Sequence, residues 1–144
     1  MSREIKFRGK ATTYDPMVIP NDGWVKGFYY QDLCNGEIKH FIKGGEMDWE
    51  VDEDTIGQFT GLHDKNGKEI YEGDILGTNE RVIGWVKGGV RGYCYDVAYI
   101  NHPAGESDWP LYGTVKYDYP GKIKVIGNIY DNKELLEGGF KNEE

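Results

Sequence analysis

The sequence predicts an all-β protein built mainly from short antiparallel strands. Three observations lead to this fold class. First, 21 of the 144 residues are glycine, and these glycines separate short apolar runs instead of forming a Gly/Ser tract. Second, aromatic residues make up 14% of the chain, and aromatic side chains favour strands. Third, about ten short segments alternate polar and apolar residues at fairly even spacing, which is typical of β-sandwiches and barrels.

The composition also predicts what fills the core. Hydrophobic residues make up only 38% of the chain, whereas tyrosine, phenylalanine and tryptophan number 11, 5 and 4. We therefore expect most of the aromatic side chains to be buried, with the polar tips of tyrosine and tryptophan bonded to a partner.

Residues 1–56 are expected to form an N-terminal β layer, either as a separate domain or as part of one continuous domain. Residues 4–8 alternate polar and apolar side chains, so that Ile5 and Phe7 would face inward. Asn35-Gly36 separates two further alternating runs, and both residue types tolerate the positive φ angles of a hairpin turn. Strands of this layer are expected at residues 4–8, 24–34, 37–43 and 46–54.

The densest acidic stretch lies at residues 46–54, where six of nine residues carry carboxylates. Apolar side chains alternate with them, which is typical of an edge strand with a solvated acidic face. The alternative interpretations are a divalent metal site and a surface that imitates phosphate. The candidate interaction surface consists of Glu46, Asp48, Glu50 and Asp52 from this stretch, and of Trp109 from a predicted loop at residues 101–110.

Residues 57–144 are expected to form a barrel-like β domain, with an SH3-like barrel that begins at the Gly73-Asp74 turn. A short C-terminal helix is predicted after it, because Asp131 can cap a helix and Glu134 can complete a capping box. Strands are expected at residues 56–60, 68–71, 75–76, 81–87, 92–100, 111–119 and 122–130.

The residue types needed for catalysis or metal binding are scattered. His40, His63 and His102 form no i,i+4 pair and no cluster with cysteine. His63 and its neighbour Asp64 would point to opposite faces of a strand. Residues 64–69 favour an ordinary hairpin turn over a calcium loop, because their spacing departs from the EF-hand pattern. We therefore expect no enzyme activity, no cofactor and no metal.

Charge and cysteine content exclude several classes of function. The formal net charge is −8, which disfavours direct binding to nucleic acid or to anionic lipid. The chain contains no apolar run of membrane-spanning length, and we expect no secretory signal, because the first residues lack an apolar stretch. Cys34 and Cys94 are too few for a disulfide scaffold. We expect a cytoplasmic protein with two free thiols.

Three segments, taken in order, resemble the signatures of the YopX family. They are REIKFR at residues 3–8, TGLHDKNGKEIYEGDIL at residues 60–76 and VIGNIYDNKELLE at residues 125–137. Gly9 and Lys10 stand where the family has an Ala-Trp pair, which changes a local contact. Residues 77–121 match no signature. The resemblance implies an all-β protein of bacteriophages and prophages that tends to self-associate. It implies no activity and carries over no catalytic residue.

The preferred functional hypothesis is a non-enzymatic binding or assembly protein that a phage produces inside its host. The resemblance, the strand pattern and the lack of a catalytic constellation motivate it. Its partners would be further copies of the chain, in a homo-oligomer, or a host or phage protein. A second hypothesis is an acidic modulator that imitates DNA toward a host nucleic-acid enzyme. A third is a carboxylate-based hydrolase, which only the number of carboxylates supports.

Overall fold

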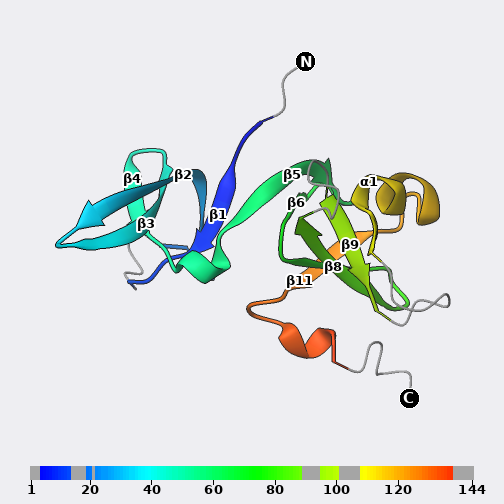
Figure 1. Ribbon diagram of the computed structural model, residues 1–144. Coiled ribbons are helices and arrows are strands. Elements are labelled where there is room, and N and C mark those ends of the chain that lie inside the picture. Colours follow the sequence, from blue (N-terminus) through cyan, green and yellow to red (C-terminus); the bar gives the residue numbers. More distant parts are fainter. Residues whose placement is uncertain (1–3, 14–18, 21, 89–94, 101–107, 138–144) are drawn as a thin grey trace. The chain divides into compact units, whose positions relative to one another are not determined.

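The computed structural model describes residues 4–13, 19–20, 22–88, 95–100 and 108–137 (Figure 1). The chain divides into two compact units, residues 1–59 and 60–144, and strand β5 (Gly57–His63) runs from the first into the second. Both units are built from antiparallel sheets, which confirms the predicted all-β class.

The sheet of the first unit follows the order β4-β3-β2-β1-β5, and each neighbouring pair is antiparallel. The predicted acidic strand lies at the edge of this sheet, as expected, but it ends earlier, because a 3-10 helix follows it. The elements of this unit are β1 (Phe7–Lys10), β2 (Trp24–Cys34), β3 (Glu37–Gly44), β4 (Met47–Glu50) and η1 (Glu53–Thr55).

The turn between β2 and β3 is the hairpin that the sequence predicts. Asn35 has a φ of 54° and Gly36 a φ of 84°, so both residues occupy the left-handed region of a type I′ turn. Cys34 pairs directly with Glu37 on either side of this turn. The two-residue turn therefore sets the register of the hairpin, and with it the face on which each side chain of β3 lies.

The core of the first unit is small and aliphatic. Val25, Ile42 and Val51 form its buried cluster, and partly buried side chains such as Phe7 pack around them. The expectation that Ile5 faces inward is wrong, because Ile5 precedes β1 and is 59% exposed. Alternation places a residue on one face of a strand, but burial also needs a second layer to cover it.

The second unit contains a five-stranded antiparallel sheet in the order β10-β9-β8-β7-β11. A hairpin of β5 and β6 precedes it. Among the described residues β10 pairs only with β9 and β11 only with β7, so this sheet is open and the expected SH3-like barrel is not confirmed. The strands are β6 (Glu69–Tyr71), β7 (Asp74–Gly77), β8 (Val82–Gly88), β9 (Tyr95–Tyr99), β10 (Asp108–Pro110) and β11 (Lys124–Asn128).

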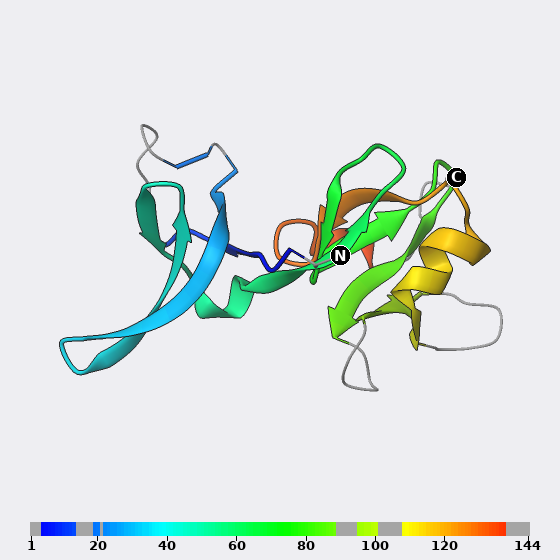
Figure 2. The ribbon, with the colours of Figure 1, turned by 90° about the horizontal axis from the view of Figure 1, so that it is seen from above.

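Residues 111–119 are helical, which corrects the predicted strand. Helix α1 (Leu111–Gly113) continues into a π-helical turn, η2 (Thr114–Asp118), and Figures 1 and 2 show this segment in yellow beside the green strands. Leu111 is buried in the core cluster, and Val115 and Tyr119 pack against it. These side chains recur at helical spacing, so that one face of the segment covers the core.

The predicted C-terminal α-helix is a single 3-10 turn, η3 (Lys133–Leu135). Its N-cap is Asn132, not Asp131, and no side chain makes the capping bond. Asn132 instead accepts a hydrogen bond from the backbone amide of Asn128 through its side-chain oxygen, at 3.1 Å. The side chains thus stabilise the turn that leads into η3.

The cores of both units are mainly aliphatic, which corrects the expected aromatic core. Trp24, Phe59 and Tyr71 are the buried aromatic residues among those that the structure describes. The second unit buries seven aliphatic side chains in one cluster: Ile70, Leu76, Ile83, Val86, Val97, Leu111 and Ile123. Among the described residues, six partly buried aromatic side chains pack around these clusters, namely Phe7, Tyr29, Trp49, Tyr95, Tyr99 and Tyr119.

The expectation that tyrosine hydroxyls find partners is confirmed for several side chains. Tyr99 shares a hydrogen bond of 2.7 Å with Thr114, and burial raises the pKa of Tyr99 to about 12. Other tyrosine hydroxyls bond to side chains at 2.5 to 2.9 Å, namely Tyr29 to His40, Tyr30 to Asp48, Tyr71 to Glu69 and Tyr119 to Arg81.

Candidate functional site

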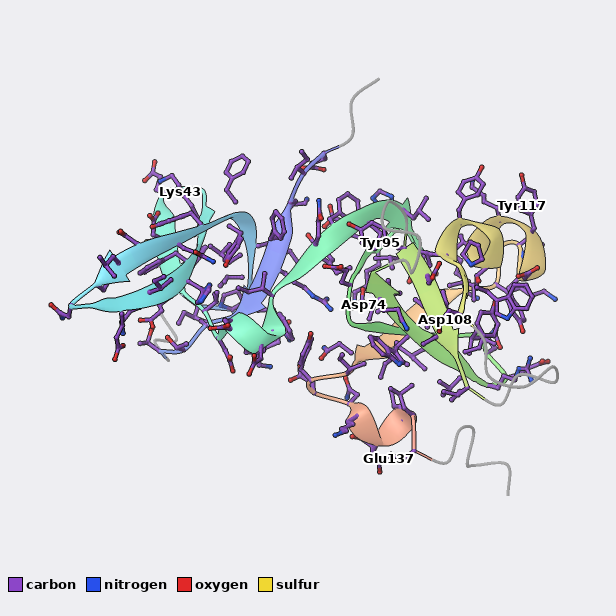
Figure 3. All side chains as sticks on the ribbon, viewed as in Figure 1. Lys43, Asp74, Tyr95, Asp108, Tyr117 and Glu137 are labelled. Carbon is purple, nitrogen blue, oxygen red and sulfur yellow. The ribbon has the colours of Figure 1, made fainter. Side chains whose placement is uncertain are left out.

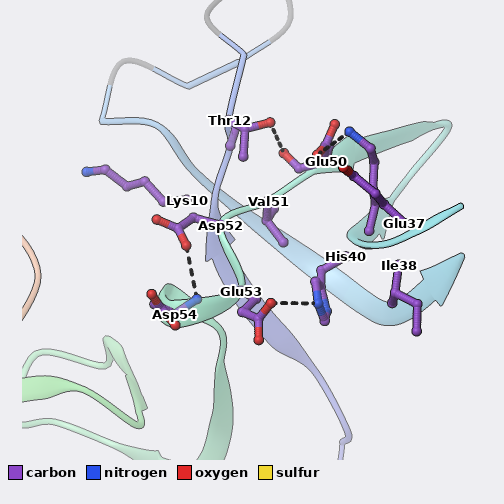
Figure 4. Close-up of a pocket in the computed structure, with 12 residues that line it drawn as sticks. Lys10, Thr12, Glu37, Ile38, His40, Glu50, Val51, Asp52, Glu53 and Asp54 are labelled. Carbon is purple, nitrogen blue, oxygen red and sulfur yellow. Dashed lines mark hydrogen bonds and ion pairs between the residues drawn. The ribbon is translucent and has the colours of Figure 1, made fainter. Parts of the chain in front are cut away.

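An acidic groove in the first unit is the strongest candidate site (Figure 4). It has a volume of about 620 Å³ and lies where β4 separates from β3. Five carboxylates line it, against two lysines and one histidine. The charged residues of this groove are Glu37, Glu50, Asp52, Glu53 and Asp54, together with Lys10, Lys39 and His40.

Beyond Phe41, no strand among the described residues pairs with the edge of β3 that faces this groove. The pairing between β3 and β4 ends at Phe41 and Glu50, and the amide of Val51 then donates to the carbonyl of His40 at 2.9 Å. Since backbone groups repeat their direction every second residue, the amide and carbonyl of Ile38 point toward the same edge. The groove therefore combines carboxylates with backbone groups positioned to pair with another extended chain.

His40 links β3 to the helix η1. Its Nδ1 lies 2.7 Å from the hydroxyl of Tyr29, and its Nε2 lies 3.0 Å from Oε1 of Glu53 (Figure 4). Gln31 in turn donates to the Tyr29 hydroxyl at 3.0 Å. Both ring nitrogens of His40 are thus engaged within the protein, and the side chain holds one wall of the groove in place.

Two of the predicted acidic residues are neutralised by lysines of the neighbouring strand. Glu50 pairs with Lys39 at 3.5 Å, and Asp48 pairs with Lys43 at 3.3 Å. Figure 3 labels Lys43 on the sheet of the first unit. Cross-strand pairs of opposite charge stabilise a sheet, so part of the acidic stretch serves its own edge strand.

Asp48 is also the partner of Tyr30, whose hydroxyl donates to Oδ2 at 2.5 Å. This hydrogen bond raises the pKa of Tyr30 to about 12, and it holds the pKa of the Asp48 carboxyl below its ordinary value. The ring of Tyr30 stacks on Phe41 at 5.2 Å between ring centroids. Asp48 therefore belongs to a cross-strand cluster on the sheet and does not line the groove.

The predicted site residues are only partly brought together. Glu50 and Asp52 both line the groove, and Asp52 also caps η1 by accepting from the amide of Asp54 at 3.0 Å. Glu46 lies exposed in the turn before β4. Trp109 belongs to strand β10 of the second unit. It pairs there with Val97 of β9, and its side chain is 41% exposed. Of the five predicted residues, two therefore line one groove.

The sequence-based prediction missed the residues that β3 contributes. Glu37, Lys39 and His40 reach the groove because the hairpin register places them beside the acidic stretch. The Asn-Gly turn contained this information, since it sets which residues of β2 and β3 lie opposite each other. No turn motif of this kind in the sequence indicated the register between β3 and β4.

The Asp64 turn has a structural role. Oδ1 of Asp64 accepts from the amides of Asn66 and Lys68 at 2.8 and 2.9 Å, and Oδ2 accepts from the amide of Val125 at 2.9 Å. Asp64 is buried and His63 is exposed, as expected for neighbours on a strand. The predicted hairpin turn is confirmed, and its carboxylate also anchors β11.

The cysteines and the remaining histidine singled out in the sequence do not form a site among the described residues. Cys34 is a free thiol, whereas Cys94 and His102 lie outside the described residues. Within the described ranges, no three His, Cys, Asp or Glu side chains form a group that could hold a metal ion. None of the helices seen in the structure has the length and apolar character needed to cross a bilayer.

Two antiparallel β units, one with an acidic groove beside an open strand edge, define an all-β protein with a candidate binding surface. The chain belongs to the YopX family, because the family model described as YopX protein matches residues 6–137. No curated protein gives a significant match. The chain is similar to the crystal structure of protein EF1440 from Enterococcus faecalis, with 23% sequence identity and a TM-score of 0.43. The match covers 94% of this chain and 100% of that chain.

Proposed function

We propose that this chain is a non-enzymatic binding protein, encoded by a phage or prophage, that acts in the cytoplasm of the bacterial host. The acidic groove is the observation that carries this proposal. It would bind an extended, basic segment of a partner protein along the open edge of β3. Membership of the YopX family suggests the association with phages and prophages.

Charge and backbone geometry support this type of partner. Glu37 and Asp54 line the groove, and neither carboxylate forms an ion pair with any described residue. The outward backbone groups of Ile38 can pair with an incoming strand, while the carboxylates contact its lysines and arginines. Strand addition supplies the affinity and charge supplies the preference for a basic sequence.

The side chains of the groove favour binding over chemistry. A general base must have an atom within hydrogen-bonding reach of the proton that it removes. His40 uses one ring nitrogen on Tyr29 and the other on Glu53, and Glu50 is paired with Lys39. These contacts leave the groove as a recognition surface.

The second candidate is an acidic modulator of a host nucleic-acid enzyme. The five carboxylates of the groove favour it, because a basic enzyme surface would be attracted to them. The pairing of Asp48 with Lys43 and of Glu50 with Lys39 weakens the resemblance to a row of phosphates. We therefore rank it below the recognition of a single basic segment.

Self-association is part of the proposal. β4 is an edge strand, yet it is short and carries the charged Asp48 and Glu50, which are features that limit strand pairing between copies. A homo-oligomer would therefore form through another surface. Sedimentation velocity over a range of protein concentrations will show whether one defined oligomer forms.

The function can be tested by affinity capture from host lysate, with and without nuclease. The variant Glu37→Gln/Asp54→Asn removes the two unpaired carboxylates, whereas Glu134→Gln/Glu137→Gln makes the same charge change on exposed residues of η3 and its flank. We expect one dominant host or phage protein, retained after nuclease, lost at high salt and lost with the groove variant only.

A defined probe makes the test independent of the lysate. A short synthetic strand of alternating lysine and valine should bind the wild-type protein and the η3 control equally, and the groove variant at least tenfold more weakly. Equal binding to all three proteins would contradict the groove as the site. Binding of an acidic peptide of the same length would contradict the proposed partner chemistry.

A further inference from the structure

A second cavity lies in the second unit and has the opposite charge. Its volume is about 440 Å³, and three cationic side chains line it, Lys65, Arg81 and Lys122, against one carboxylate, Glu80. The polar residues Thr78, Asn79 and Tyr119 complete the lining. A net positive cavity stands out in a chain whose formal net charge is −8.

Three turns of the second unit converge at this cationic cleft. Lys65 comes from the turn between β5 and β6, Arg81 from the turn between β7 and β8, and Lys122 from the turn before β11. The residues are far apart in the sequence, and the fold brings them to one end of the unit. Loops that a rigid sheet holds together are common places for binding sites.

Hydrogen bonds hold these turns to one another. The amide of Lys65 donates to the carbonyl of Ile123 at 2.9 Å. Nη2 of Arg81 donates to the hydroxyl of Tyr119 at 2.9 Å. The ammonium group of Lys124 donates to Oδ1 of Asn79 at 3.0 Å. The cleft is therefore built before any ligand arrives, which reduces the entropy lost on binding.

The charges of the two lysines in the cleft are not neutralised by any carboxylate of the described residues. Neither Lys65 nor Lys122 forms an ion pair with a residue that the structure describes. The carboxylate nearest to Lys65 in sequence, Asp64, is buried and bonded to three backbone amides. Three like charges around one cavity repel one another, and an anion between them removes that repulsion.

We propose that this cleft binds a small anion that carries more than one phosphate group. Arg81 offers a planar fork that matches phosphate oxygens, and Lys65 and Lys122 supply compact charges. The volume lies within the range of small-molecule sites. A long nucleic acid is disfavoured, since it would extend beyond the cleft onto a strongly acidic protein.

The proposal can be tested by isothermal titration calorimetry of the full chain with pyrophosphate at physiological ionic strength. Lys65→Gln and Lys122→Gln should each weaken binding about tenfold or more, because each removes a charged hydrogen-bond donor. Glu80→Gln should strengthen binding a few-fold, because it removes the opposing charge. Lys68→Gln is the matched control, since Lys68 lies in the same turn as Lys65 but does not line the cleft.

Further ligands distinguish the sources of phosphate. Equal affinity for inorganic triphosphate and a metal-free nucleoside triphosphate assigns the site to phosphate groups alone, whereas tighter nucleotide binding adds a contact to the nucleoside. Binding of a single-stranded oligonucleotide without either small anion would overturn the proposal. Equal weakening by Lys65→Gln and Lys68→Gln would also overturn it, because a diffuse cationic surface would then explain the binding.

A variant that keeps every charge guards against loss of folding. Tyr119→Phe removes the hydroxyl that holds Arg81 and leaves the ring in the core. It should weaken pyrophosphate binding a few-fold, with an unchanged circular dichroism spectrum. If neither Tyr119→Phe nor the two lysine variants changes the affinity while all remain folded, the cleft is not the site.

Discussion

The two units of this chain have different cores, and their candidate sites carry opposite charges, although both units contain more carboxylates than lysines and arginines. The first unit buries a cluster of three aliphatic side chains, and its candidate site is an acidic groove on an open strand edge. The second unit buries seven, and its cationic cleft lies where turns converge. The net charge of −8 is spread over both units, so the net charge of the chain or of a unit is a poor guide to local binding chemistry.

The difference between the cores also bears on stability. Hydrophobic burial is the main stabilising contribution, so the second unit should be the more stable of the two. The first unit depends more on the hydrogen bonds of its sheet and on cross-strand contacts such as Tyr30 with Phe41. Substitutions placed at matched positions in the two units test this difference in stability.

The largest effect is expected from matched truncations in the two cores. Leu76→Ala and Ile42→Ala each remove a fully buried side chain, and each should lower the free energy of unfolding by about 2–5 kcal/mol. Because the units have separate clusters, Ile42→Ala should speed amide hydrogen exchange mainly in β2 to β4, and Leu76→Ala mainly in β7 to β9.

Leu33→Ala provides the control for these truncations. Leu33 is 68% exposed near the tip of the β2–β3 hairpin, so its truncation should change the free energy of unfolding by no more than about 0.5 kcal/mol. If Ile42→Ala and Leu76→Ala speed exchange equally throughout the chain, the units unfold together. The proposed difference in stability between them would then be wrong.

The next largest effect is expected at Asp64, because no described carboxylate of the first unit is shown to accept from three backbone amides as it does. Asp64→Ala deprives three backbone amides of their acceptor, and it should lower the free energy of unfolding by about 2–3 kcal/mol. The loss is limited to this range because Asn66 and Lys68 are exposed, so that water can accept hydrogen bonds from their backbone amides in place of Asp64. Chemical denaturation monitored by fluorescence will measure it.

Two further variants test this explanation of Asp64. Asp64→Asn keeps one oxygen acceptor, so it should lose less stability than Asp64→Ala. Asp54→Ala removes an exposed carboxylate of the first unit and should change stability by no more than about 0.5 kcal/mol. Equal losses from Asp64→Ala and Asp54→Ala would mean that the bonds to the three amides contribute nothing.

Local signals in the sequence predicted turns and strands well. The strand at residues 24–34 appears as β2 with those bounds, and the turns at Asn35 and Gly36 and at Asp64 form as expected. Turns of this kind depend on the φ preferences of a few adjacent residues, so distant contacts are not needed to predict them. The same reasoning located the acidic edge strand, whose pattern is also local.

Features that depend on distant contacts were predicted less well. Residues 111–119 contain tyrosine, valine and threonine, which favour strands, yet the core selects a helix with Leu111 and Val115 on one face. The helical spacing of these two residues was visible in the sequence. The cationic cleft had no such signal, because Lys65, Arg81 and Lys122 meet only through the packing of three turns.

A smaller effect is expected from glycines that occupy equivalent turns in the two units. Gly36 and Gly67 have φ angles of 84° and 85°, and a Cβ atom at either position meets no atom within 4 Å. Gly36→Ala and Gly67→Ala should therefore lower the free energy of unfolding by about 1 kcal/mol each, from backbone strain alone. Thermal unfolding of both variants will test the equivalence.

Gly113→Ala is the control that distinguishes backbone strain at a positive φ angle from the effect of replacing a glycine as such. Gly113 is helical, and it too has open space around a Cβ atom. Alanine favours a helix, so this variant should raise the free energy of unfolding by up to about 1 kcal/mol. A loss of stability in all three variants would contradict strain as the cause.

The smallest effect concerns a single hydrogen bond on the first unit. The bond from Tyr30 lowers the pKa of the Asp48 carboxyl, so its contribution to stability is present above the ordinary aspartate pKa and is lost as the pH falls. The same bond raises the pKa of Tyr30 from 10.0 to about 12, so that contribution is lost as the pH rises through this interval.

Tyr30→Phe should remove the contribution of this hydrogen bond to the pH dependence of stability, both at acid and at alkaline pH. Nuclear magnetic resonance titration of the Asp48 carboxyl carbon should give a higher pKa in this variant than in the wild-type protein. The pKa should not return fully to its ordinary value, because Lys43 remains beside the carboxylate. Tyr29→Phe is the control, since Tyr29 bonds to His40 from the other face of β2 and should leave the Asp48 titration unchanged. If both variants leave it unchanged, the lysine alone lowers the pKa, and the cross-strand charge pair is what distinguishes this edge.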